Sequence, residues 1–306
     1  MSIVEKKSAG EVRPVSTDTS VPQSGSQRVT VIEPRSGLAT INLSEVWAFR
    51  DLLFTFAIRD VKLRYRQTAL GVIWVVMQPI LSALIFNIIF GMVGKGRFTY
   101  DGYPPFIFIF VGQMAWSVIN SSITRTTGSL IGNANLVSKI YFPRLVLPLS
   151  NIGSVAIDFG VSFAVLLILL VLYHIPLTIW IVTLPFFLLL TTFAAIGFGL
   201  YMAALMVSYR DIAYVLPIFL QLLMYASPVN FSSTGLPEDI KKHAWALLFF
   251  QLNPVTTLVN GMRWSLLGTN PPSLISVAVM TAFAVVLFYG GAFFFRTQET
   301  RFADVI

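Results

Sequence analysis

The sequence predicts an all-α polytopic membrane protein with six transmembrane helices, and three observations lead to this fold class. The chain of 306 residues is 56% hydrophobic and only 11% charged, and its mean hydropathy is +0.76. Soluble domains carry about 25% charged residues, so this chain has too little polar surface to cover a globule in water. Several charge-free stretches are long enough for a helix to cross a bilayer, and short polar or proline-containing segments separate them.

The N-terminal region differs in composition from the rest of the chain. Residues 1–40 are rich in Ser, Thr, Gly, Pro and charged residues and show no apolar periodicity, which predicts a disordered cytoplasmic tail. The tail has no apolar core of a signal peptide, so we expect it to stay in the cytoplasm. Residues 41–306 are expected to form the transmembrane domain.

The segment 44–67 has the pattern of an amphipathic helix. At 100° per residue, Thr55, Arg59 and Lys62 fall on one narrow polar stripe, and Phe49 and Leu53 fall on the opposite side. A helix with a broad apolar face and a basic stripe lies in the membrane interface, and a soluble helix packed on a partner is the alternative. The basic residues of this segment nearest the first span are Arg59, Lys62, Arg64 and Arg66.

Charge-free stretches place the transmembrane spans. No charged residue occurs between Gln67 and Gly94, and none occurs from 159 to 209. The second stretch is too long for one span, and Pro176 supplies the break because proline disfavours helix at the preceding residue. We expect spans at about 71–93, 104–124, 146–172, 177–207, 212–228 and 274–295, followed by the tail RTQETRFADVI.

The segment before the last span predicts a different structure. Pro228, Pro237 and Pro254 separate apolar runs that are too short to cross a bilayer. Such runs suit a re-entrant pair or interfacial helices. We expect 229–262 to be a re-entrant segment that folds back at the extracellular face.

The distribution of the basic residues predicts the orientation. The net charge is +7, and six spans place both termini on one side of the membrane. The positive-inside rule assigns that side to the cytoplasm, because cytoplasmic loops carry an excess of Lys and Arg. Of the 21 Lys and Arg residues, the five expected outside are Lys95, Arg97, Lys241, Lys242 and Arg263.

The sequence lacks the residue patterns that several kinds of site require. It has no cysteine and only two histidines, His174 and His243, far apart in the sequence, so a metal site is not expected. No GxxxxGK[ST] loop and no catalytic triad or carboxylate pair is evident, so we expect no catalytic residue, no bound cofactor and no nucleotide site in this chain. Asp158 lies well inside a predicted span, where a carboxylate is either paired structurally or used in transport.

Four stretches carry a resemblance to a known family. They are LRYRQTALGVIWVVMQPI at 63–80, LVSKIYFPRLVLPLS at 136–150, SYRDIAYVLP at 208–217 with SPV at 227–229, and RFADVI at the C-terminus. With the predicted topology, they make the chain from about residue 44 onwards resemble the membrane (permease) subunit of polysaccharide-exporting ABC transporters. Residues 1–40 have no counterpart in this family.

The resemblance implies a function and a set of partners. The chain would be a homodimeric permease in the bacterial inner membrane, bound to two copies of a separate ATPase that holds ATP and Mg. The complex would export a lipid-linked polysaccharide such as O-antigen or capsule, and no nucleic acid is implied. Two alternatives stay open: an ABC exporter subunit for a drug or lipid, and a secondary transporter or channel that works without ATP.

The resemblance also assigns the loop 133–146 as the coupling loop that contacts the ATPase. Phe142 would insert into a groove of that partner while cations pair with acidic groups or phosphates around it. The alternative is an ordinary positive-inside loop with Phe142 dipping into lipid. The residues expected to couple are Lys139, Tyr141, Phe142, Pro143 and Arg144.

Three further groups of residues are candidates for contact with the substrate. The cations of 44–67 would hold a lipid pyrophosphate, unless they serve only topology and general lipid contact. Tyr209, Arg210 and Asp211 would gate the point where substrate enters. The alternative is that Arg210 and Asp211 pair or cap a helix. Trp74, Trp116, Tyr201 and Tyr225 would line a channel for sugar rings, although Trp and Tyr also form interfacial belts.

Overall fold

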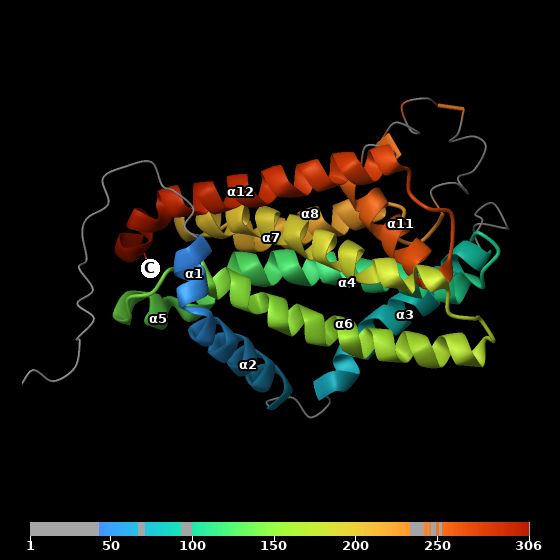
Figure 1. Ribbon diagram of the computed structural model, residues 1–306, viewed down its shortest axis with the longest axis horizontal. Helices are drawn as coiled ribbons and strands as arrows, with labels where there is room; N and C mark the ends of the chain where they lie inside the picture. Colours follow the sequence, from blue (N-terminus) through green and yellow to red (C-terminus); the bar gives the residue numbers. More distant parts are fainter. Residues whose placement is uncertain are drawn as a thin grey trace, which may run out of the picture. The chain divides into compact units, whose positions relative to one another are not determined.

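The computed structural model describes residues 43–66, 71–92, 100–232, 242–243, 245, 249–250 and 253–305. At some of these, including Arg64 and Arg66, only the backbone is described. The expected tail, 1–40, and much of the expected re-entrant segment lie outside the described residues. The part of the chain that is described consists of helices and connecting loops (Figure 1), as the all-α prediction requires.

The helices follow the charge-free stretches of the sequence, separated by short connections. In chain order they are α1 (Leu43–Ala48), α2 (Arg50–Arg66), α3 (Gly71–Met92), α4 (Pro105–Gly128), the 3-10 turn η1 (Ile131–Asn133), α5 (Ala134–Lys139), α6 (Val146–Leu172), the 3-10 turn η2 (Ile179–Thr183), α7 (Leu184–Ser208), α8 (Ile212–Tyr225), α11 (Pro254–Leu267) and α12 (Leu274–Val305).

Four helices within the described residues are long and apolar enough to cross a bilayer. They occupy Pro105–Gly128, Val146–Leu172, Ile179–Ser208 and Leu274–Glu299. The apolar segments Val76–Phe90 and Ile212–Tyr225, in α3 and α8, are shorter than the roughly 20 residues of a typical span. The structure thus supports a polytopic membrane protein, and the crossing of α3 and α8 stays a prediction.

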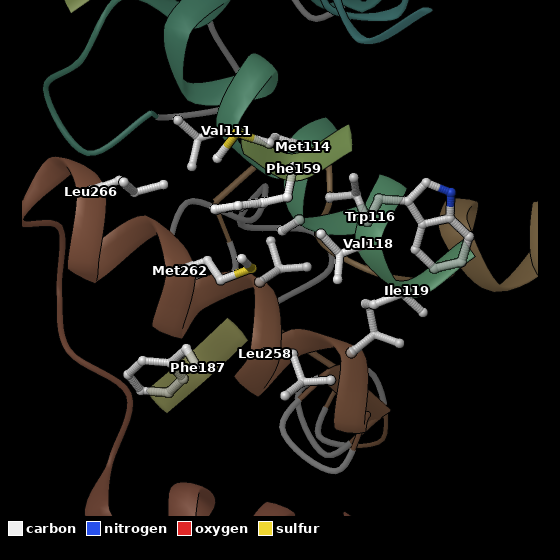
Figure 2. Packing of buried hydrophobic residues seen from close by; sticks show 14 of the residues in the cluster. Val111, Met114, Trp116, Val118, Ile119, Phe159, Phe187, Leu258, Met262 and Leu266 are labelled. Atoms are coloured by element: carbon white, nitrogen blue, oxygen red, sulfur yellow. The ribbon is translucent and has the colours of Figure 1, made fainter. Parts of the chain in front are cut away.

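Helix α4 lies at the centre of the packing. It contacts α3, α6, α7 and α11, and most of its apolar length is buried. Figure 2 shows part of this core, in which Phe187 of α7 lies beside α11 and side chains of α4, such as Met114 and Ile119, lie on the other side. The labelled side chains of α11 in this core are Leu258, Met262 and Leu266.

Helices α7 and α12 form the most extensive helix pair of the described chain. Their backbones meet at Gly197, and the rings of Phe193 and Phe288 stack beside that point at 3.9 Å between centroids. Small residues allow backbones to approach closely. Helices in lipid associate through such packing, because burial of apolar surface does not favour association there.

A second buried cluster, at the end of the bundle that carries α5, joins distant segments. It combines Phe56 of α2, Phe142 and Leu147 near the start of α6, Leu200 of α7 and Phe302 of α12. We call this end the α5 end, and the end that carries α11 the α11 end (Figure 1).

Two helices extend beyond the ranges expected from charge. Helix α4 continues through Arg125 to Gly128, and α12 continues through the expected tail to Val305. In α12, Phe295 and Phe302 are two turns apart, share one face and are buried, with their ring centroids 5.2 Å apart. Burial of that face explains why α12 extends to Val305, although the charged residues of the same turns predict a tail.

We expect Gly197→Ala to lower the free energy of unfolding by about 1–3 kcal/mol, the usual cost of overpacking. A Cβ at this position would lie 2.6 Å from the backbone nitrogen of Phe288. Thermal unfolding in detergent measures the effect. The matched control is Gly160→Ala on α6, where a Cβ meets nothing within 4 Å, and equal melting of both variants would contradict the packing described.

Candidate functional site

The stretch predicted to couple to an ATPase has an exposed tip. Helix α5 ends at Lys139, and the chain then becomes extended at Ile140. Lys139 is exposed, and the exposed fractions of Ile140 and Tyr141 are 56% and 71%. We call these three residues the 139–141 tip. It presents one cation, one aliphatic side chain and one aromatic ring.

The structure places Phe142 inside its own chain. Its exposed fraction is 5%, and its ring meets that of Phe56 on α2 edge to face at 5.8 Å. The carbonyl of Pro143 accepts a hydrogen bond from the backbone of Val146 at 3.0 Å, which begins α6. In this packing Phe142 fixes the tip to α2, and it cannot insert into a partner without leaving its contact.

Arg144 also turns toward the protein. Its guanidinium Nη1 donates a hydrogen bond to the backbone carbonyl of Glu299 in the last turns of α12. Phe142 and Arg144, on either side of Pro143, therefore contact two different helices of the same chain.

The basic residues of α2 divide into different environments. Arg59 donates to Oδ1 of Asp60 at 2.7 Å and to Oδ1 of Asn133 at 2.7 Å, and its guanidinium lies 4.8 Å from the ring centre of Phe56. Lys62 is exposed. The side chains of Arg64 and Arg66 lie outside the described residues. Arg59 thus holds α2 against η1, while Lys62 is accessible to lipid or phosphate.

The predicted gate residues lie between α7 and α8. Tyr209, Arg210 and Asp211 are exposed. Asp211 occupies the position before α8, but its side chain makes no capping hydrogen bond. Arg210 lines a groove of about 400 Å³, and the other lining residues are Ile131, Ala134, Met206, Val207, Ala213 and Tyr214.

The four aromatic residues predicted to line a channel lie in different places. Trp116 lies in the core beside Val118 and Ile119 (Figure 2). Tyr201 stacks on Phe294 of α12 at 5.5 Å. Trp74 and Tyr225 are exposed, so these two rings are accessible to a second copy or to a substrate.

The intramembrane carboxylate has a basic partner. Asp158 of α6 accepts a hydrogen bond from Nη2 of Arg125 in the last turn of α4, and both side chains are largely buried. Asn151 donates to the backbone carbonyl of Arg125 at 3.2 Å. This pair ties α4 to α6, as expected for a charged group at membrane depth.

A polar centre at the α11 end surrounds Arg263, which the sequence predicts in an outside loop. Arg263 lies in α11 and is only 1% exposed. Its guanidinium donates to the carbonyls of Pro228 at 2.8 Å and Phe231 at 3.1 Å, and also to Val229. It lies 3.9 Å from the ring centre of Phe108 on α4.

Neighbouring contacts hold the same turn of the chain. Gln113 of α4 donates to Asn230 at 2.7 Å, and Asn253 donates to Ser227 at 2.9 Å while capping α11. A Cβ at Gly112 would lie 2.0 Å from the carbonyl oxygen of Val229. The residues 227–231 are therefore fastened to both α4 and α11.

The charge of Arg263 fits this role. Burial lowers the pKa of Arg263 to about 9, and the negative charge of Asp101 opposes that shift. The guanidinium is therefore cationic at neutral pH, and it is matched by carbonyl dipoles and an aromatic face. The signal available in the sequence was a cation within an otherwise apolar helical run after Asn253-Pro254.

No group of three or more His, Cys, Asp or Glu residues that could hold a metal ion occurs among the described residues. The candidate sites described above are surfaces of the helical bundle. They comprise the 139–141 tip, Lys62 and the groove beside Arg210.

The fold is that of a polytopic helical membrane protein. Comparison with known sequences gives its family. Residues 51–267 match the ABC-2 type transporter family, and the chain belongs to that family. The resemblance stated from sequence motifs is thereby confirmed.

The alignments with known relatives cover nearly the whole length of each relative. The chain is 28% identical over 258 residues to "O-antigen export system permease protein RfbA" of Klebsiella pneumoniae, covering 84% of this chain and 95% of that protein. It is 25% identical over 262 residues to a protein of the same description in Myxococcus xanthus, covering 86% and 98%. It is 24% identical over 247 residues to "Polysialic acid transport protein KpsM" of Escherichia coli, covering 79% and 91%.

We expect Arg263→Met to lower the free energy of unfolding by about 3–5 kcal/mol, because it leaves buried carbonyls without their donor. Arg263→Lys keeps the charge but lacks the fork that reaches several carbonyls, so an intermediate loss is expected. Thermal unfolding in detergent measures both. Lys62→Met, at an exposed cation, is the control, and an Arg263→Met variant as stable as that control would refute the buried network.

Proposed function

We propose that this chain is the permease subunit of an ATP-driven exporter that moves a lipid-linked polysaccharide across the bacterial inner membrane. The polysaccharide is of the O-antigen or capsule type. The observation that carries this proposal comes from the relatives. Proteins named as O-antigen export system permeases and as a polysialic acid transport protein align with this chain over 91% or more of their own lengths.

The energy source lies in a separate subunit in this proposal. The sequence has no GxxxxGK[ST] loop, so ATP and Mg would be held by a partner ATPase. The 139–141 tip is the surface best suited to bind that partner. An exposed aromatic ring beside a cation is typical of residues that dominate protein interfaces, where Tyr is enriched.

The α5 end faces the cytoplasm in this proposal, because the segments there carry the basic residues. Lys62, Lys139 and Arg144 all belong to segments of the second buried cluster or directly adjoin them. This assignment follows the positive-inside rule and places the tip on the side where ATP is available.

Lys62 and Arg210 are the accessible cations that we assign to the anionic head of the lipid-linked substrate. The groove beside Arg210 is otherwise apolar, which suits an amphiphile with a charged head. A cation near a membrane surface attracts anionic lipid by on the order of 1 kcal/mol. Two copies of the chain would enclose the glycan path, with Trp74 and Tyr225 as the exposed rings available to line it.

The pairing of Asp158 favours an ATP-driven mechanism over a proton-coupled one. An ion pair with Arg125 gives Asp158 a structural role between α6 and α4. This observation weighs against the secondary-transporter alternative. An ABC exporter for a drug or lipid stays the competing proposal within the family.

The proposed substrate is tested in proteoliposomes that hold the full chain with its co-expressed ATPase. We expect the ATP hydrolysis rate to rise about tenfold when a polyprenyl-pyrophosphate glycan is supplied, because substrate binding selects the active conformation. The same glycan without its lipid is the control. Stimulation by simple lipids or drugs, with none by the lipid-linked glycan, would identify the competing function.

The docking surface is tested by the double substitution Lys139→Ala with Tyr141→Ala. Loss of two exposed side chains from an interface centre should weaken ATPase association by about tenfold or more, measured by co-purification at fixed detergent and salt. The matched control is Tyr173→Ala with Lys242→Ala, an exposed tyrosine and lysine outside the tip. Undiminished association in the tip variant would exclude this surface.

A further inference from the structure

The last turns of α12 reach the stretch that carries the tip. Phe302 is 1% exposed and packs in the cluster that also holds Phe142, Leu145 and Leu147. The charged residues of RTQETRFADVI predict a tail here. In the structure they are a helix whose buried face lies against the start of α6.

Arg144 makes the polar part of this contact. Its guanidinium donates to the carbonyl of Glu299, and its backbone N–H lies 3.4 Å from Oε1 of the same residue. The guanidinium carbon also lies 5.8 Å from the ring centre of Phe302. Arg296, one turn earlier, lies 3.9 Å from the second carboxylate oxygen of Glu299 and helps to fix that side chain.

The opposite side of the stretch is held by α2. Phe142 packs on Phe56. The guanidinium of Arg59 lies over the ring of Phe56 and donates to Asn133, directly before α5. The 139–141 tip therefore projects from a base that is fixed to α2 on one side and to α12 on the other.

Helix α12 continues from this base along α7 without a break. At their closest approach, a Cβ on Gly291 would lie 2.3 Å from the carbonyl oxygen of Gly197. Backbones this close leave little room to slide, because packed interiors have low compressibility and transmit strain. A displacement at the tip would therefore be transmitted to α12 and, through the close packing, to α7.

We propose that Arg144 and Phe302 form a brace that transmits movement of the tip to α12 and, through it, to α7. They are positioning residues: they act through the backbone of the tip and do not touch the ATPase. This inference rests on the proposed function and assigns the C-terminal turns of α12 a part in it. It differs from a docking role for Arg144, whose Nη1 and backbone N–H both bond to Glu299 of the same chain.

The test separates binding of the ATPase from use of its energy. Phe302→Ala and Arg144→Met are made in the full chain, co-expressed with the ATPase, and purified as the complex. We expect co-purification of the ATPase within about twofold of the unmodified chain. We expect the glycan transported per ATP hydrolysed to fall by about tenfold, a loss of coupling of the size that allosteric links commonly carry. Phe302→Leu, which keeps an apolar side chain in the cluster, should restore most of that ratio.

Each outcome has a distinct meaning. Loss of co-purification in Arg144→Met would make Arg144 a docking residue and overturn the brace. An unchanged transport ratio in both variants would overturn it as well. Failure of the unmodified chain to bind any ATPase would instead contradict the proposed function.

A second variant covers the case in which Phe302→Ala fails to fold. The chain has no cysteine, so Arg144→Cys with Glu299→Cys provides a unique pair for a short thiol cross-linker. We expect the pair without cross-linker to lose coupling and the cross-linked pair to regain it. A cross-linked protein that stays inactive would show that the two segments must separate during transport, which contradicts the brace.

Discussion

The scarcity of water around most of this chain is the constraint on which the rest of the structure depends. Backbone and charged groups in hydrocarbon must find their partners within the protein. The helices satisfy the backbone, and the charges gather near the ends of the apolar segments. Where a charge does lie deep in the protein it is matched, as Asp158 is by Arg125 and Arg263 is by three backbone carbonyls.

The same constraint gives the two ends of the bundle different character. At the α11 end, the buried guanidinium of Arg263 fastens residues 228–231 to α4 and α11, and Gly112 permits the close approach. At the α5 end, the contacts surround an exposed tip with Tyr141 at its apex. In the proposed exporter, the α5 end would receive the movement of the ATPase.

The prolines and glycines occupy different places in the helices. Proline begins α4, α7 and α11 at or near their first residues, where its missing N–H has no helical partner to lose. Glycine lies where backbones touch, at Gly197 and Gly291 between α7 and α12. The stiff pair α7–α12 is therefore able to link the tip to the apolar core around α4.

The sequence by itself determined the helical membrane fold, because a charge-free stretch long enough to span leaves the backbone no other stable arrangement in lipid. It also placed Lys139 and Tyr141 in the polar connection between two apolar helices and identified the family through ordered motifs. Only the tertiary structure decided which side chains of that connection face outward. Phe142 and Arg144 turn inward because Phe56 and the face of α12 ending at Phe302 lie beside them. Arg263 is buried because the carbonyls of 228–231 converge on it. Such contacts join residues far apart in the chain, and neither charge counts nor helical periodicity carries information about them.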